Sequence, residues 1–307
     1  MITQHAPTTT HSSPACMGGK VQLYPWQWQG RSVSVVFETL GKGEPVLLLP
    51  AMSTVSTRAE LAQLAGVLAP HFQVTVLDWP GFGASARLRL AYQPELYKQC
   101  LFDFVQATFT TPPAVIAAGH AAGYVMQLAA QAPSMWAKIG LVAPTWRGPL
   151  AVMGAPSAMR SGVRALVRSP LIGQTLYNLN THPAFLKWMY RRHVFVDAAK
   201  LTPDYIQQRH QGTQQPGARY APAAFVTGGL DPVQTREAFL AYFEGLSIPV
   251  MVVVAEQAPP SSKAEMMEIA ALPNLQVAQL PGTLGMAEEY GNEVAAVVLP
   301  FLQAEPN

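Results

Sequence analysis

The residues that most suggest chemistry lie between Ala114 and Ala129, around a corner of small residues at Gly119–Gly123. An apolar run precedes this corner and a run with helical spacing follows it, which predicts a strand, a sharp turn and a helix. A serine at the middle of a Gly-x-Ser-x-Gly corner in this context is a nucleophile for acyl transfer. The middle residue here is Ala121, and its methyl group cannot attack a substrate.

The elements that must position this corner follow from the hydrophobic pattern. Val21–Gly41 alternates apolar and polar residues, which predicts two antiparallel strands joined near Gly30. Thr57 and Glu60 form a capping-box signature at the start of a helix. Continuous apolar runs predict strands buried on both faces. Such runs cover residues 45–50, 114–118, 138–144 and 249–255. Two further strands are expected over 72–78 and 275–280, and helical segments over 95–109, 234–243, 262–272 and 292–302.

The alternation of strands and helices stops at Trp146 and resumes after Pro222. The residues between them form helical pieces cut by prolines and glycines, which predicts a lid, or cap, inserted after the sixth strand. The predicted organisation is a disordered tail over 1–20, a core over 21–145 and 223–307, and a cap over 146–222. The tail is rich in Thr, Ser, His and Pro and has no apolar run of the signal-peptide kind.

This order of elements resembles the α/β-hydrolase family over roughly Val33–Leu302. The motifs that carry the resemblance are Leu47–Ala51, Leu77–Ser85, Gly119–Gly123 and Gly282–Glu289, and the second is close to the family's D-x-P-G-x-G-x-S loop. The resemblance implies an α/β fold with a mostly parallel sheet, helices on both faces and a helical cap after the sixth strand. Fold alone does not imply activity.

The resemblance also implies where a catalytic triad would stand. Ala121 holds the nucleophile position, Ala258 the position of the acid after the seventh strand, and Leu284 that of the histidine after the last strand. None of the three side chains can do the work of a serine, aspartate or histidine. The oxyanion donors would be the backbone N–H groups of Ala122 and of the Ala51–Met52 turn, which do not depend on side-chain identity.

Few other side chains could restore the missing chemistry. His120 adjoins the corner and is expected to pack, while Asp231 is expected to cap the following helix. Glu256 has no histidine to orient, and Ser53 is the one plausible relocated nucleophile. Three more polar residues are expected in structural places, namely Ser85 as a helix N-cap and Glu288 and Glu289 on a helix surface.

The composition limits the other function classes. Only 12% of the residues are charged and the net charge is +2, so no polyelectrolyte partner is indicated overall. Cys16 and Cys100 form no disulfide framework and no metal-ligand spacing, which favours a cytoplasmic protein without a metal. The sequence indicates no cofactor. The stretch at the corner is interrupted by Gly119 and His120 and is too short to be a membrane span.

The predicted cap is strongly basic. Between Trp146 and Pro222 the sequence contains ten Lys and Arg residues and only two acidic residues, Asp197 and Asp204. The arginines at 160, 164 and 168 recur at helical spacing, and two interpretations stay open. They form either an ordinary solvated face or a basic helix face for an anionic membrane or acidic partner. Nucleic acid is not indicated, because no reading motif accompanies the scattered basic residues.

Three hypotheses about function follow. The first is a non-catalytic protein that binds an apolar or acyl ligand or a protein partner under the basic cap. Peripheral contact with an anionic membrane through Arg160, Arg164 and Arg168 is expected as an option of this hypothesis. The second is an enzyme of this fold with serine-independent or otherwise unorthodox hydrolase or lyase chemistry on a small hydrophobic ester. The third is a purely structural assembly partner. The predicted ligand contacts are Ala51, Met52, Ser53, His120, Ala121, Ala122, Leu284 and Trp146.

Overall fold

The computed structural model of the protein describes residues 17–305. Most of the predicted tail over 1–20, including Cys16, lies outside the described residues. The last residues of that segment belong to the fold, because the N–H groups of Met17 and Gly19 donate to the Glu38 carboxylate at 3.0 and 2.9 Å. The first strand begins at Lys20.

An eight-stranded sheet forms the centre of the described chain, in the order β1-β2-β4-β3-β5-β6-β7-β8. The predicted hairpin is confirmed: β1 (Lys20–Trp28) and β2 (Arg31–Leu40) are antiparallel, and Gln29 and Gly30 turn between them with positive φ. The other six strands are parallel to one another. They are β3 (Pro45–Leu49), β4 (Gln73–Leu77), β5 (Ala114–Ala118), β6 (Ile139–Val142), β7 (Val250–Ala255) and β8 (Leu275–Leu280).

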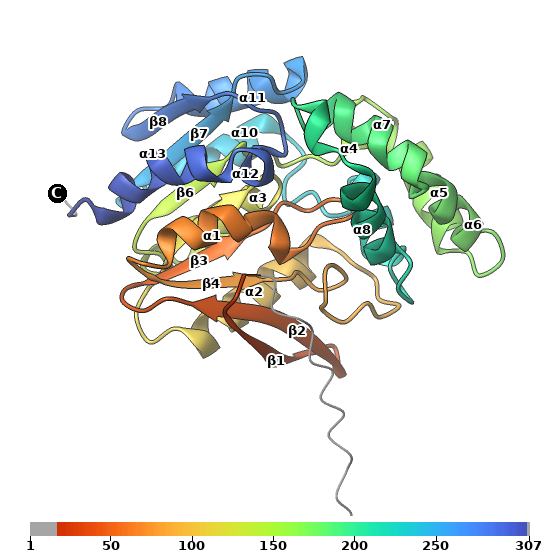
Figure 1. The fold of residues 1–307 in the computed structure, drawn as a ribbon, viewed down its shortest axis with the longest axis horizontal. Helices are drawn as coiled ribbons and strands as arrows, with labels where there is room; N and C mark the ends of the chain where they lie inside the picture. Colours follow the sequence, from red (N-terminus) through yellow and green to blue (C-terminus); the bar gives the residue numbers. More distant parts are fainter. Residues whose placement is uncertain (1–16, 306–307) are drawn as a thin grey trace, which may run out of the picture.

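Helices cover both faces of this sheet, as the sequence predicts. α1 (Ala62–Leu68) packs beside α13 (Gly291–Gln303) in front of the sheet, while α2 (Pro94–Thr108) and α3 (Ala121–Gln131) lie behind it (Figure 1). The predicted capping box is present at Thr57 and Glu60, although the chain first forms a short 3-10 turn, η1 (Arg58–Leu61). α11 (Pro260–Ala270) follows β7. Every residue of β5, β6 and β7 is buried, which explains their continuous apolar runs.

A helical segment stands between the sixth and seventh strands, as predicted. We call residues 146–222 the insert, and it lies beside the sheet at the right of Figure 1. Five of its side chains, including Leu186 and Tyr190, form a small apolar cluster of their own. The helices after β6 are α4 (Pro149–Val152), α5 (Ser157–Arg168), α6 (Gly173–Asn180), α7 (Pro183–His193), α8 (Pro203–Thr213), α9 (Tyr220–Val226) and α10 (Arg236–Leu240).

The end of the insert was predicted at Pro222, but α9 runs through this residue without a break. Tyr220, Ala221 and Ala224 of this helix already pack into the main core, so the chain returns to the core at the start of α9. Within residues 17–305, no helix is both long and apolar enough to cross a bilayer.

Candidate functional site

The sharp turn between β5 and α3 is centred on Gly119. Its φ of 51° lies in the left-handed region, which glycine enters without a steric penalty. Ala121, which the sequence placed at this corner, is the first residue of α3 and is fully buried. The corner thus lies two residues earlier than predicted, and the residue on the strained turn has no side chain. The small residues Ala117-x-Gly119-x-Ala121 were the available signal in the sequence.

Ala51, which follows β3, fills the space next to Gly119. A Cβ atom built on Gly119 would lie 2.9 Å from the Cβ of Ala51 and 3.9 Å from Oγ1 of Thr145. The first distance is well inside the optimum of about 3.5–4.0 Å for two carbon atoms. A serine at this corner would therefore collide with Ala51 unless one of the two segments moved.

The backbone donor predicted at Ala122 is used within the fold. Its N–H donates to the carbonyl oxygen of Gly119 at 3.2 Å, and the N–H of Thr145 donates to the same oxygen at 3.1 Å. On the other side of the corner, the Ser56 hydroxyl donates to the carbonyl of Ala51 at 2.6 Å. These bonds fasten the turn to its neighbours, so the Ala122 N–H is not directed at a bound carbonyl.

His120, one residue after the corner, is buried against the segment that leads into α10. Its Nε2 atom lies 2.8 Å from the carbonyl oxygen of Leu230 and 3.7 Å from Oδ1 of Asp231. The hydroxyl of Tyr124 donates to the same Leu230 carbonyl at 2.6 Å. Asp231 was expected to cap the following helix, but Thr235 caps α10 instead. Asp231 accepts the Gly148 N–H at 2.7 Å, and so it holds the start of the insert.

Burial sets the protonation of this pair. It lowers the pKa of His120 to about 4, and the hydrogen bond to the Leu230 carbonyl opposes this shift. It raises the pKa of Asp231 to about 6, opposed first by the Gly148 N–H and then by Arg160. At neutral pH the imidazole is uncharged, its Nε2–H donates to Leu230, and Nδ1 keeps a lone pair. Within the described part of the chain, Nδ1 has no hydrogen-bond partner.

The two loops predicted to carry an acid and a base are tied to each other. Ala258 is buried after β7, and Leu284 is half-buried after β8. Gln257 binds Gly282 through two hydrogen bonds, with its side-chain oxygen accepting the Gly282 N–H and its own N–H donating to the Gly282 carbonyl. Neither loop presents an imidazole or a carboxylate toward Gly119. Glu256 is exposed, and so it is not in a position to orient a buried base.

The predicted ligand contacts do not line one open cavity. Met52, His120, Ala121, Ala122 and Trp146 are buried, and the Trp146 ring stacks on Phe239 with centroids 4.3 Å apart. Ala51, Ser53 and Leu284 are half-buried, and the Ser53 hydroxyl accepts the N–H of Val55 at 3.2 Å. A hollow beside Thr145 and Trp146 has a volume of about 20 Å³, enough for roughly one water molecule.

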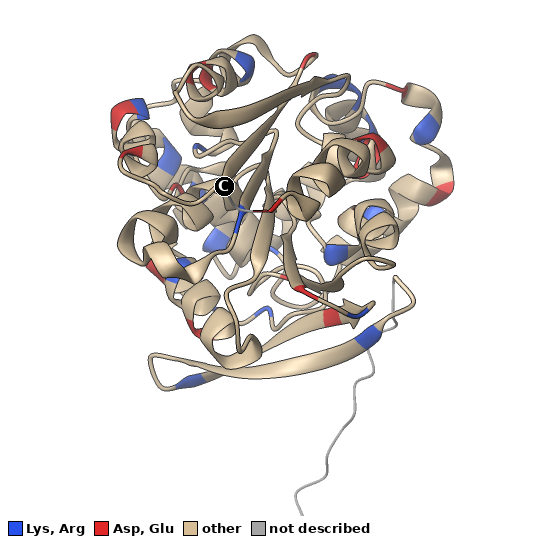
Figure 2. Cartoon of the chain, turned by 90° about the vertical axis from the view of Figure 1, so that its left-hand side faces the viewer, with Lys and Arg blue, Asp and Glu red and all other residues tan. Residues whose placement is uncertain are grey.

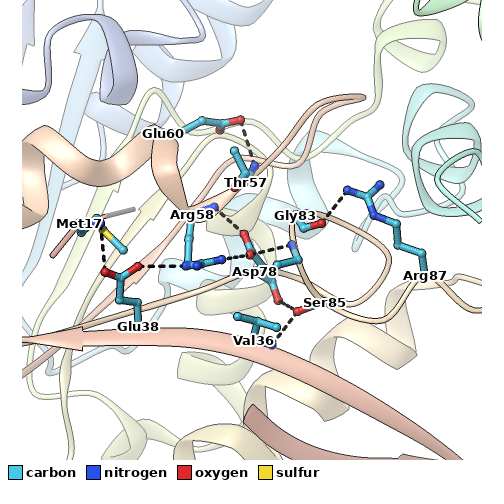
Figure 3. A network of polar contacts seen from close by, with 11 residues as sticks. Met17, Val36, Glu38, Thr57, Arg58, Glu60, Asp78, Gly83, Ser85 and Arg87 are labelled. Atoms are coloured by element: carbon cyan, nitrogen blue, oxygen red, sulfur yellow. Dashed lines mark hydrogen bonds and ion pairs between the residues drawn. The ribbon is translucent and has the colours of Figure 1, made fainter. Parts of the chain in front are cut away.

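A buried charge network that the sequence did not indicate supports the loop after β4 (Figure 3). Arg58 pairs with Glu38 at 3.3 Å and with Asp78 at 2.5 Å, and all three side chains are buried. Asp78 also accepts the N–H of Ala84 at 2.9 Å. Ser85 was predicted as a helix N-cap, but no helix begins there. Its hydroxyl donates to the Asp78 carbonyl and accepts an N–H from β2, so it fastens this loop to the sheet.

A second polar cluster holds the insert on the core. Glu288 and Glu289 were expected on the surface, and both contact the insert instead. Glu288 pairs with Arg209 of α8, whose guanidinium also lies 3.8 Å from Glu60. Glu289 accepts the N–H groups of Val196 and Asp197 at 2.8 and 2.7 Å. Burial raises the pKa of Glu60 to about 7, while Arg209 acts in the opposite direction.

The arginines of α5 face the core rather than solvent. Arg160 donates to the Thr227 carbonyl at 3.4 Å, and Arg168 donates to the Leu90 carbonyl at 2.7 Å. A Cβ atom built on Gly229 would lie 1.7 Å from Nη1 of Arg164, so this guanidinium lies against the backbone there. The expected solvent-facing stripe is therefore wrong. Long aliphatic stems let the arginines reach buried carbonyls while each charge stays near polar atoms.

Comparisons with known proteins agree with this fold. The model of the alpha/beta hydrolase family matches residues 46–296. A thermophilic esterase from Thermogutta terrifontis is similar at 19% identity and a TM-score of 0.71, with 92% of this chain and 98% of that chain covered. A haloalkane dehalogenase from Agrobacterium tumefaciens is 16% identical with a TM-score of 0.70, covering 94% and 99%. A bromoperoxidase from Bacillus anthracis is 15% identical with a TM-score of 0.71, covering 93% and 100%. No curated protein sequence matches the chain.

Proposed function

The chain belongs to the alpha/beta hydrolase family, and from this premise we propose that it is a non-catalytic member that acts by binding. The closed corner after β5 carries the proposal. Acyl transfer in this fold needs a nucleophilic side chain on that turn. Here the turn residue is Gly119, and the Cβ atom of Ala51 occupies the space that a side chain would need.

The two remaining triad positions support the same function. In this proposal they are Ala258 and Leu284, neither of which can take up or orient a proton. Their loops are fastened to one another through Gln257 and Gly282 and to the insert through Gly285, whose N–H donates to the Val194 carbonyl at 3.2 Å. These contacts hold both loops in place.

The filled interior favours binding at the outer surface over binding of a ligand beneath the insert. The side chains of Met52, His120 and Trp146, predicted to contact a ligand, are already covered by protein. Binding sites for small molecules are usually preformed hollows of about 300–1,000 Å³. The hollow beside Thr145 is far smaller than that.

The test is an assay of the purified full chain against p-nitrophenyl esters and short haloalkanes, with labelling by a fluorophosphonate probe. The expected result is no turnover above buffer and no labelled residue, with circular dichroism verifying that the protein is folded. Stoichiometric labelling of a serine, Ser53 above all, or saturable turnover of either substrate class would overturn the proposal.

One observation favours a second candidate, namely serine-independent chemistry on a small hydrophobic ester. The Nδ1 atom of His120 is buried and has no partner in the described part of the chain, and Asp231 lies on the other side of the ring. Such a histidine could accept a proton from water or from a substrate C–H if the insert opened. This candidate requires turnover that His120→Gln abolishes while the fold is retained. The absence of turnover in the wild type counts against it.

A further inference from the structure

Exposed apolar side chains are concentrated on the insert. Among the described residues thirteen large hydrophobic side chains are exposed, and ten of these lie between Met153 and Val196. The most exposed are Leu171 at 88%, Met153 at 78% and Leu179 at 66%. Single exposed apolar residues are common on protein surfaces, but a contiguous group of them marks an interaction site.

Helix α5 lies at the centre of this group because its basic face points toward the core and its apolar face points toward solvent. Its arginines bond to core carbonyls, whereas Met159, Val163 and Leu166 point to solvent. These three residues are spaced by four and three positions and so lie on one face of the helix. The same apolar surface continues into Leu171 and Ile172, in the turn before α6.

Helix α7 adds aromatic and basic side chains next to this apolar surface. Phe185 and Trp188 are exposed, and their ring centroids lie 5.6 Å apart. Arg192 lies 6.0 Å from the centre of the Trp188 ring, and Lys187 and Arg191 are exposed beside it. Aromatic side chains with one polar, solvent-exposed edge and basic side chains with long aliphatic parts are common at lipid–water boundaries.

These helices form a single outer margin of the molecule. α5 packs on α6 and α6 packs on α7, and Figure 1 shows the three at the edge of the insert that faces away from the sheet. We call the exposed side chains of α5, α6 and α7, with those of the turn between α5 and α6, the outer face. When the molecule is viewed from the side away from the insert, basic and acidic residues are interspersed instead (Figure 2).

The charge of the outer face indicates what kind of surface it would bind. From Trp146 to Val196 the chain contains seven basic residues and no Asp or Glu. Three of the seven, Lys187, Arg191 and Arg192, are exposed on α7. A second copy of the chain docked through the same face would bring like charges together with no acid to pair them. An anionic surface would complement both the apolar and the basic parts.

We propose that the outer face is a docking surface for an anionic lipid bilayer. In the docked state Leu166, Leu171 and Leu179 enter the boundary between headgroups and acyl chains, and the basic residues of α7 contact the headgroups. The insert lies on the bilayer without crossing it. This inference is independent of the proposed loss of catalysis, because an active enzyme could dock in the same way.

The test is flotation of the full chain with phosphatidylcholine vesicles, with and without phosphatidylserine. We expect binding only to the anionic vesicles, and weaker binding as salt shortens the Debye length. Each basic residue near an acidic surface contributes about 1 kcal/mol, or roughly fivefold in affinity. The triple variant Lys187→Gln, Arg191→Gln, Arg192→Gln should therefore lose affinity on the order of 100-fold.

A matched control removes the same charge from elsewhere. Lys20, Arg31 and Lys42 are exposed on the core side, and their triple replacement by Gln should reduce binding far less. The variant Leu171→Gln, Leu179→Gln keeps all charges and should lose affinity on the order of 100-fold through the apolar part alone. Equal losses in the two charge variants would overturn the proposal.

Two further results would also overturn it. One is a wild type that stays unbound to anionic vesicles at low salt. The other is a stable dimer in sedimentation that Leu171→Gln, Leu179→Gln converts to a monomer, because the outer face would then be an interface between copies. Neither result would touch the proposal about catalysis, which the ester assay and the labelling probe test separately.

Discussion

The corner after β5 and the outer face of the insert both differ from what their places in the fold lead one to expect. The corner is filled by apolar atoms where polar groups are expected, and the outer face exposes apolar side chains to solvent. At the corner, where this fold can carry reactive polar groups, Gly119 has no side chain and Ala51 closes the space with apolar atoms. On the insert, where solvent should meet polar groups, Leu171 and Leu179 are exposed and Arg168 turns inward. The corner is explained by packing within the monomer. The apolar side chains of the outer face are not covered by the monomer's own packing, and the proposed docking to a bilayer rests on this observation.

The largest expected effect tests whether the stability of the core depends on the buried charge network around Arg58. Arg58→Met would remove the guanidinium that pairs with the buried carboxylates of Glu38 and Asp78. Breaking a buried ion pair in this way costs about 3–5 kcal/mol of unfolding free energy. Urea unfolding measures the loss. As a control, Arg89→Met at an exposed position should stay within about 0.5 kcal/mol of the wild type. A loss in Arg58→Met as small as that of the control would mean that the network contributes little to stability.

The next effect separates the two regions by pH. The pKa of His120 at the corner is lowered to about 4 from its ordinary 6.5. Between these values the unfolded chain binds more protons than the native one, so stability is complete above pH 6.5 and falls as the pH drops toward 4. The loss is at most about 3 kcal/mol. His120→Gln should flatten this acid limb of a stability profile measured by urea unfolding.

The junction between insert and core should respond in the opposite sense. Burial raises the pKa of Glu60 to about 7 from its ordinary 4.5, although Arg209 opposes the shift. Its contribution is therefore complete below pH 4.5 and is lost as the pH rises through 7. Glu60→Gln keeps a capping-box side chain and should reduce the loss by at most about 3 kcal/mol. Asp231, with a pKa raised to about 6, shares this sign and remains in the variant. A profile that is unchanged in both variants would contradict the assignment of the two limbs.

A smaller effect is expected from a serine at the corner itself. Gly119→Ser introduces a side chain at a φ of 51° and a collision with Ala51, which together should cost about 2 kcal/mol. No turnover should appear, because Ala258 and Leu284 stand where an acid and a base are expected, and restoring one member of three recovers little. Adding Ala51→Gly should recover about half of the lost stability. Ester hydrolysis by either variant, or by Ala121→Ser, would show that a base is within reach and would break the comparison at its core side.

Much of the fold could be predicted from the sequence, since periodicity and turn residues report burial directly. The hairpin at Gly30, the buried strands and the capping box at Thr57 all appear as expected. The corner was misplaced by two residues because Gly119-x-Ala121-x-Gly123 and Ala117-x-Gly119-x-Ala121 both satisfy a small-residue pattern. Only the backbone angle distinguishes the two registers.

The polar contacts were much harder to predict, because they join residues far apart in the chain. Arg58 meets Glu38 and Asp78 across two other elements, and nothing in its local sequence indicates a buried arginine. The helical spacing of the α5 arginines was visible, but spacing alone does not say which side of a helix faces the protein. On α5 the apolar side chains of Val163 and Leu166 are exposed, so the usual rule that apolar residues face inward does not hold there.

The smallest expected effect tests that orientation directly. Each guanidinium of Arg160, Arg164 and Arg168 lies against backbone of the core. A hydrogen bond that involves a charged group contributes about 1.5–3 kcal/mol. These arginines are only half-buried, so Arg168→Gln should cost about 1 kcal/mol of unfolding free energy. If the arginines instead formed a solvated stripe, stability would not change and vesicle binding would fall steeply. The triple Gln variant should bind anionic vesicles as the Lys20, Arg31, Lys42 control does, because its lost charges lie on the protein side of α5. Vesicle flotation and urea unfolding on the same protein samples separate the two orientations.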